Sequence, residues 1–160
     1  MRIGVNRAVE AVACDWWVLG DWQGLEDFTP IGRPGLVVPR VIFERLEQHV
    51  HEVKLYDIHE YKIRGVEQVH YEDIATDCPV PLSPQTWSFA AALVFAETLG
   101  PKIIEVVGCD WSGDQDWDGK HFAERTEQRW ERERNDVMRV IEWLDGKGIR
   151  VDGLPSSQNG

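Results

Sequence analysis

The segment from Leu82 to Gly108 joins a long apolar helix pattern directly to an apolar strand pattern. Ser83 is a candidate N-cap and Pro84 suits the first turn of a helix. Gly100, followed by a proline, ends the pattern. The next run, KIIEVVG, is apolar with little alternation, which is typical of a strand covered on both faces. The segment therefore predicts a helix that leads into a central, buried strand.

Strand and helix patterns alternate along the rest of the chain. Short β-rich runs occupy residues 2–5, 16–20, 36–39, 53–58, 102–108 and 148–151, with a weaker edge strand at 66–71. Helical patterns cover residues 7–13, 39–50, 83–100 and 122–144, the last with a stripe of Trp130, Val137, Ile141 and Leu144. This order predicts an α/β fold, a three-layer Rossmann-like open sheet that is mostly parallel and has helices on both faces. We expect a single domain over residues 1–154 and a flexible tail at 155–160.

Composition narrows the classes of function. The chain has 160 residues and a formal net charge of −11, so binding to a nucleic-acid backbone is not expected. Three widely spaced cysteines give neither a disulfide framework nor a zinc motif, which favours a reducing cytoplasm. The longest apolar run is far too short to cross a bilayer, so a soluble cytoplasmic protein is expected, with homo-oligomers left open.

Candidate binding residues follow the predicted strands, because ligands of open parallel sheets bind beyond the carboxyl ends of the strands. The loop at residues 21–35 is longer than usual, which indicates a lid or a functional excursion. The predicted helix start at Ser83 to Thr86 can offer backbone N–H groups to an anion such as phosphate. The other candidates for binding a nucleotide-type ligand are Asn6, Asp21, Trp22, Arg40, Gly108 and Trp111.

The acidic loop after KIIEVVG is a candidate metal site. Asp114, Asp116 and Asp118 begin like a calcium loop, but Arg125 stands where the last, bidentate carboxylate belongs. A looser Mg²⁺ or Ca²⁺ site could use these three residues together with Asp110, and a carboxylate-rich solvated turn is the alternative. The same loop lacks the lysine of a phosphate-binding P-loop.

Two further groups of residues bear on chemistry. His59 and His121 lie near the predicted ligand edge, where a histidine can act as a general acid or base, and we take His59 with Asp110 as the catalytic candidates. Arginines interleave with glutamates between residues 124 and 134, a pattern that indicates a solvated helix face.

The segments VNRAVEAVACDWWVLGDW and LSPQTWSFAAALVFAETLGPKIIEVVGCDWSG also carry a resemblance. Together they resemble the Rossmann-like family of archaeal 6-hydroxymethylpterin diphosphokinase-like proteins, which is similar in fold to bacterial sialyltransferases and has small phage and prophage members. Asn6 with Ala8, Asp21, Ser83, and Gly108 with Asp110 match its short motifs in order. The resemblance implies a nucleotide or nucleotide-sugar ligand and transfer of a glycosyl or phosphoryl group.

One departure from that family keeps several functions open. Its members begin with an additional strand and a Gly-rich loop, whereas this chain starts at what corresponds to the second strand. Activity could therefore be lost, or the element supplied by another subunit. The first hypothesis is a nucleotide-binding, transferase-like domain, in which Asn6 and Asp21 hold base or ribose and Asp110 holds a cation or an acceptor hydroxyl. The alternatives are a non-catalytic phage or bacterial accessory protein that retains the fold, and a metal-assisted hydrolase using the Asp110 to Asp118 loop.

Overall fold

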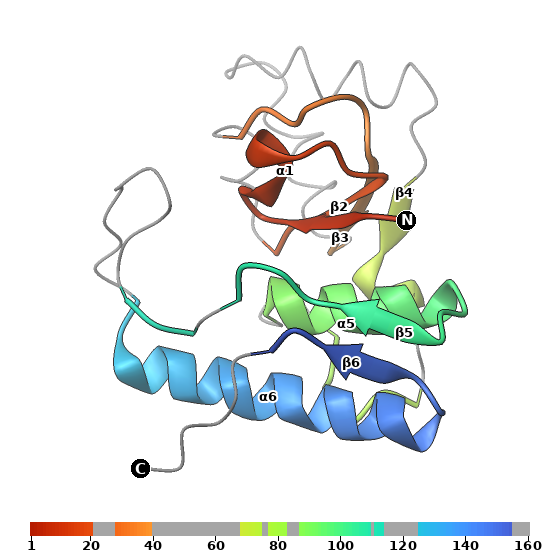
Figure 1. Ribbon diagram of the computed structural model, residues 1–160, viewed down its shortest axis with the longest axis vertical. Coiled ribbons are helices and arrows are strands. Elements are labelled where there is room, and N and C mark those ends of the chain that lie inside the picture. Colours follow the sequence, from red (N-terminus) through yellow and green to blue (C-terminus); the bar gives the residue numbers. More distant parts are fainter. Residues whose placement is uncertain are drawn as a thin grey trace.

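The computed structural model describes residues 1–20, 28–39, 68–74, 77–82, 87–109, 111–113 and 125–154. Within these ranges helices alternate with strands, and every strand pair is parallel, which confirms the predicted α/β class. The described strands form two separate sheets, one of four strands and one of two (Figure 1). The predicted helix at 39–50 beyond its first residue, the predicted strand at 53–58 and the predicted tail lie outside the described residues.

The four-stranded sheet has the order β1-β2-β3-β4. Its register aligns Gly4 of β1 with Trp17 of β2, and Trp17 with Leu36 of β3. All four strands were predicted to within two or three residues at each end, because their apolar runs are short and bounded by turn residues. The strands are β1 (Ile3–Val5), β2 (Trp16–Val18), β3 (Gly35–Val38) and β4 (Gln68–His70), with a short helix α1 (Ala8–Ala11) after β1.

The second sheet corrects the prediction of a central strand. Strand β5 (Ile103–Glu105) is three residues long and pairs with β6 (Arg150–Asp152). Its first residue, Ile103, is 52% exposed, and Glu105 is exposed as well. The apolar run extends beyond the strand. In the part that follows β5, Val106 is buried and Val107 is 87% exposed. The prediction that this apolar run forms a strand covered on both faces is therefore wrong for β5.

Helix α5 (Ser88–Thr98) begins later than its sequence pattern predicts. Trp87 is the N-cap residue, with an extended backbone and no side-chain capping bond, whereas the sequence pattern predicted Ser83 for this position. The indole Nε1 of Trp87 donates to Asp136 Oδ2 at 3.1 Å, which fixes the chain as it enters the helix. The predicted end is confirmed, since Gly100 follows the helix with a φ of 68° and donates its N–H to Glu97.

Helix α5 lies between the two sheets and is buried on opposite faces (Figure 1). One face packs with the four-stranded sheet, where the ring of Phe95 meets Trp16 edge-on at 4.8 Å. The other face, which includes Leu93 and Val94, packs with β5, β6 and the last long helix. Alanines at 90, 91, 92 and 96 keep the helix thin enough for close approach from both sides. A helix, and not a strand, is thus the central element of the described fold.

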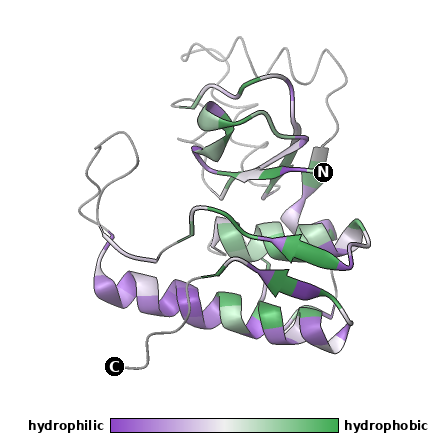
Figure 2. Ribbon diagram, viewed as in Figure 1, coloured by the Kyte–Doolittle hydropathy of each residue, from purple (hydrophilic) through white to green (hydrophobic). Residues whose placement is uncertain are grey.

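Helix α6 (Glu127–Gly146) carries the predicted apolar stripe, but only in its second half. Val137, Val140 and Leu144 are fully buried against α5 and the second sheet. Figure 2 shows that the first half of α6 is mainly hydrophilic and that its hydrophobic residues gather toward its end. Thr126 caps the helix by accepting from the N–H of Arg129 at 3.2 Å, so the helix starts after the predicted Phe122.

Two close contacts hold the strand ends in place. The Tyr71 hydroxyl, which follows β4, is fully buried and donates to the carbonyl of Leu19, just beyond β2, at 2.8 Å. Beyond β6, Gly153 has a φ of 84°, and a Cβ there would collide with the carbonyl oxygen of Val106. Glycine is therefore required where β6 leaves β5.

Candidate functional site

The carboxyl ends of β1, β5 and β6 face the same way. Figure 1 shows these three strands running in one direction, with the start of α6 on the side toward which they point. The loops after β1 and β5 therefore leave their strands on the same side of the molecule (Figure 1). Of the predicted site residues, Asn6 follows β1, and Gly108 and Trp111 follow β5, as the sequence predicts.

The turn after β1, which we call the β1 corner, consists of Asn6 to Glu10 with Phe28 and Thr29. Asn6 adopts a left-handed backbone with a φ of 50°, a conformation that asparagine tolerates better than most residues. Its N–H donates to Val18 at 3.0 Å, and its carbonyl accepts from the indole Nε1 of Trp17 at 2.9 Å. The backbone is therefore fixed, while the Asn6 side chain is exposed at the strand end.

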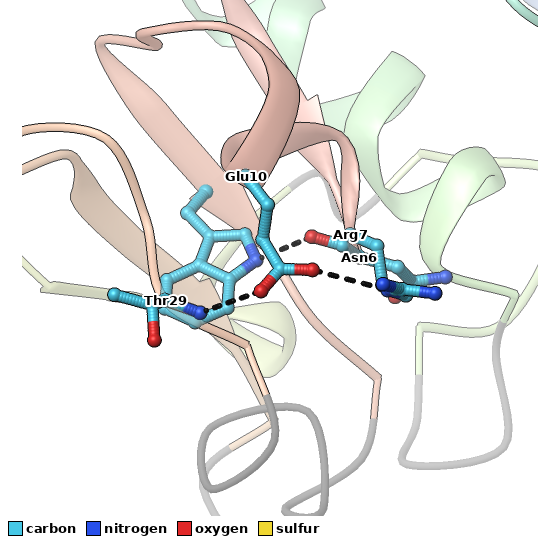
Figure 3. Close-up of polar contacts among 5 residues, drawn as sticks. Asn6, Arg7, Glu10 and Thr29 are labelled. Atoms are coloured by element: carbon cyan, nitrogen blue, oxygen red, sulfur yellow. Dashed lines mark hydrogen bonds and ion pairs between the residues drawn. The ribbon is translucent and has the colours of Figure 1, made fainter. Parts of the chain in front are cut away.

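A carboxylate closes the β1 corner (Figure 3). Glu10 Oε2 pairs with Arg7 Nε at 3.1 Å, and Glu10 Oε1 accepts from the N–H of Thr29 at 3.1 Å. The Arg7 guanidinium also lies 5.6 Å from the ring centroid of Phe28. Both oxygens of Glu10 are thus engaged within the protein, and the corner is joined to the chain that leads into β3.

The loop after β5 has an unusual backbone. Gly108 and Gly113 have φ values of 75° and 73°, and Trp111 between them has a φ of 48°. A left-handed backbone is natural for glycine but costly for tryptophan, and such outliers gather at functional sites. Trp111 is only 5% exposed and packs 6.1 Å from the ring of Phe89. Its indole Nε1 is buried and has no hydrogen-bond partner, where the structure describes the chain.

Three tryptophans meet three arginines beside this loop, and we call these six residues the Trp–Arg cluster. Each guanidinium lies over one indole ring: Arg125 over Trp130 at 5.9 Å, Arg129 over Trp87 at 5.4 Å, and Arg134 over Trp111 at 5.9 Å. Trp130 Nε1 also donates to the carbonyl of Gly113 at 2.9 Å. The cluster therefore links the start of α5, the loop after β5 and the first turns of α6.

A glutamate sits on the buried side of the same helix. Glu133 precedes Val137 by four residues and Val140 by seven, so it belongs to the face of α6 that packs on α5. Burial raises the pKa of the Glu133 carboxyl above its ordinary value of 4.5, although Arg129 and Arg125 act in the opposite direction. Glu133 is half-buried, whereas Glu127, Glu131 and Arg132 are exposed, as expected of a solvated helix face.

Most of the predicted site residues cannot be placed. Asn6, Gly108 and Trp111 are described and lie at strand ends, but whether they contact a ligand stays a prediction. The remaining candidates lie outside the described residues: Asp21, Trp22, Arg40, His59, Ser83, Thr86, Asp110, Asp114, Asp116 and Asp118. Sequence reasoning did not select Trp87, Trp130, Arg129 or Glu133 as site residues. A signal for Glu133 existed, since it interrupts the apolar stripe of α6.

Two features of the described residues bear on the kind of site. Within the described ranges, no three or more His, Cys, Asp or Glu side chains are grouped so that they could hold a metal ion. Among the helices in those ranges, none combines the length and the apolar character needed to cross a bilayer.

Comparisons with known proteins add no relative. The chain matches no model of a protein family, no characterised protein sequence and no solved structure. The function is therefore inferred from the residues and their geometry.

Proposed function

We propose that this chain binds a nucleotide or a nucleotide sugar at the edge formed by the carboxyl ends of its parallel strands. The observation that carries the proposal is the Trp–Arg cluster beside the loop after β5, which pairs three indoles with three guanidinium groups. Indole rings suit stacking on a base, and arginine suits phosphate. In a chain with a net charge of −11, such a local group of arginines favours a small anionic ligand over a nucleic acid.

The exposed side chain of Asn6, which follows β1 of the four-stranded sheet, supports a ligand site at the same edge. Its amide can donate to and accept from a ribose or a base, while its backbone is already fixed by Trp17 and Val18. Asp110, which stands between Cys109 and Trp111 in the sequence, is proposed to hold a cation or an acceptor hydroxyl. Transfer of a glycosyl or phosphoryl group and binding without turnover are the two uses that the sequence leaves open for such a site.

Thermal denaturation in the presence of ligands tests the proposal. The panel consists of nucleoside monophosphates, ATP and CMP-linked or UDP-linked sugars, each with and without Mg²⁺, Mn²⁺ or Ca²⁺. A ligand at a hundred times its dissociation constant should add about 2.7 kcal/mol, which corresponds to roughly 5–10 °C in Tm. If no nucleotide or nucleotide sugar shifts Tm, the proposal is wrong; a shift with metal alone would favour the metal-assisted hydrolase.

Two substitutions locate the site. Asp110→Asn should abolish the nucleotide-induced shift, and Asp145→Asn, an exposed residue near the end of α6, is its control. Asn6→Gly should weaken binding about tenfold or more, because it removes the amide but keeps a residue that tolerates a φ of 50°. Product analysis with the best ligand then separates transfer from binding. Full ligand shifts in both variants would place the ligand elsewhere.

A further inference from the structure

Strand β5 has one edge without a neighbouring strand among the described residues. It pairs with β6 on one side only, so the second sheet ends at β5. The unpaired edge of a strand presents a row of backbone N–H and C=O groups that can bind another extended chain. The outer edge of β5, on the side away from β6, is therefore an interaction surface to be examined in its backbone groups and its side chains.

The hydrogen bonds to β6 show which backbone groups of β5 reach this outer edge. The carbonyl of Lys102 accepts from the first residue of β6 at 3.1 Å, and the N–H of Val106 donates to the last residue of β6 at 2.8 Å. Successive residues of a strand direct their backbone groups to opposite edges. Ile103 and Glu105 therefore offer their N–H and C=O groups on the side away from β6.

The side chains of β5 add apolar surface to these backbone groups. Ile104 packs against the apolar core between α5 and α6, so an added strand would meet the same core on this face of the sheet. On the outside, Ile103 and Val107 are 52% and 87% exposed, and Glu105 is exposed beside them. A strand edge with exposed apolar residues is a template for a further strand.

The four-stranded sheet limits what can occupy this edge. Figure 1 shows that β5 lies on the side of its own sheet that is nearer to the four-stranded sheet. That sheet ends in β1, which pairs only with β2 among the described strands and runs in the same direction as β5. A second folded copy would bring a whole sheet to the side where the four-stranded sheet already lies. A single extended segment needs the width of only one strand.

We infer that the outer edge of β5 binds an extended segment of another polypeptide, which adds as a third strand parallel to β5. The parallel direction follows the described strand pairs, which are all parallel. The segment would carry apolar side chains at alternate positions, facing α5 and α6, and basic or neutral side chains between them, next to Glu105. This inference does not depend on the proposed nucleotide.

Amide hydrogen exchange, measured by NMR on the intact chain, tests the inference. The probes are three peptides of about seven residues in which valine alternates with lysine, threonine or glutamate. In the chain alone, the N–H groups of Ile103 and Glu105 should exchange at least about 100-fold faster than that of Ile104, which faces β6. The lysine peptide should slow both at least about tenfold, and the glutamate peptide should protect least, because Glu105 and the net charge of −11 repel it.

Two matched pairs show whether backbone pairing causes the protection. Ile103→Pro removes one N–H from the outer edge but none of the bonds to β6, so the lysine peptide should no longer protect Glu105. Ile103→Ala keeps this N–H and should retain the protection. The second pair uses the unchanged protein, so it does not depend on the folding of a variant. The lysine peptide with N-methyl groups at alternate residues should protect neither amide, whereas its unmethylated form should protect both.

The outcomes separate the possible occupants. Protection by the lysine peptide that is lost on N-methylation supports the inference, and its extension to Ile3 and Val5 would show that the same segment also pairs with β1. Slow exchange of Ile103 and Glu105 in the chain alone, or no protection by any of the three peptides, would overturn the inference. Protection that grows with protein concentration, without any peptide, would overturn it too and assign the edge to a second copy.

Discussion

The β1 corner and the Trp–Arg cluster lie beside strand ends on the same side of the molecule, yet the hydrogen bonding of their polar groups differs. In the β1 corner both oxygens of Glu10 are used, one by Arg7 and one by the N–H of Thr29. In the Trp–Arg cluster the N–H of Trp111 is buried and without an acceptor among the described residues. A hydrogen-bond network in which every group is paired stabilises a turn, whereas a buried group without a partner can form a hydrogen bond with a ligand.

The largest effect should come from disturbing the close approach of Gly153, after β6, to Val106, after β5. Gly153→Ala forces a Cβ against the carbonyl of Val106 at a φ of 84°, and we expect a loss of about 2–4 kcal/mol in the free energy of unfolding. Urea denaturation measures it. Gly148→Ala is the control, because it has a similar φ of 75° but open space around the Cβ, and should cost about 1–2 kcal/mol. Equal losses would contradict the close approach of the two strands.

Tyr71→Phe tests the four-stranded sheet and should lower the free energy of unfolding by less than Gly153→Ala does. The substitution leaves the carbonyl of Leu19 without its buried donor, so we expect a loss of about 1–3 kcal/mol. Hydrogen exchange then sharpens the comparison: protection should fall first in β2 and β3 and should persist in α6. A uniform loss of protection would mean that α5 couples the two sheets into one cooperative unit.

Glu10→Ala removes the central group of the β1 corner. The corner loses its ion pair and the acceptor of the Thr29 N–H together, and a loss of about 1 kcal/mol is expected at neutral pH. Glu131→Ala, an exposed glutamate on α6, is the comparison and should change stability by less than about 0.5 kcal/mol. Similar values for the two variants would show that the corner network contributes nothing.

Glu133→Gln should have the smallest effect and the opposite sign. Because the folded-state pKa of Glu133 is raised, the folded protein binds more protons than the unfolded chain between the ordinary value of 4.5 and the raised value. Glu133 therefore costs nothing well below pH 4.5, and its cost grows as the pH rises through that window. The variant should gain stability over the wild type as pH is raised from about 4 to 7 by urea titration. A gain that does not depend on pH would exclude burial of the charge as its cause.

Prediction from sequence succeeded where local patterns decide the outcome. The four strands of the first sheet were found, as was the end of α5 at Gly100, because β-branched runs and a glycine with positive φ are local signals. The start of α5 was misplaced because the N-cap position falls on Trp87, whose indole bonds to Asp136 on α6, a residue 49 positions away. The strand-end rule correctly placed Asn6, Gly108 and Trp111 after strands, and their role in binding stays a prediction.

The sequence by itself determined the alternation of strands and helices, the parallel direction of the strands and the concentration of polar residues after them. These follow from periodicity and turn chemistry, which act over a few residues. Only the tertiary structure decided that α5 is the central element, that KIIEVVG enters a two-stranded sheet, and that Glu133 of a charged helix is half-buried. Burial depends on which elements meet, and contacts between residues far apart in the chain leave no period in the sequence.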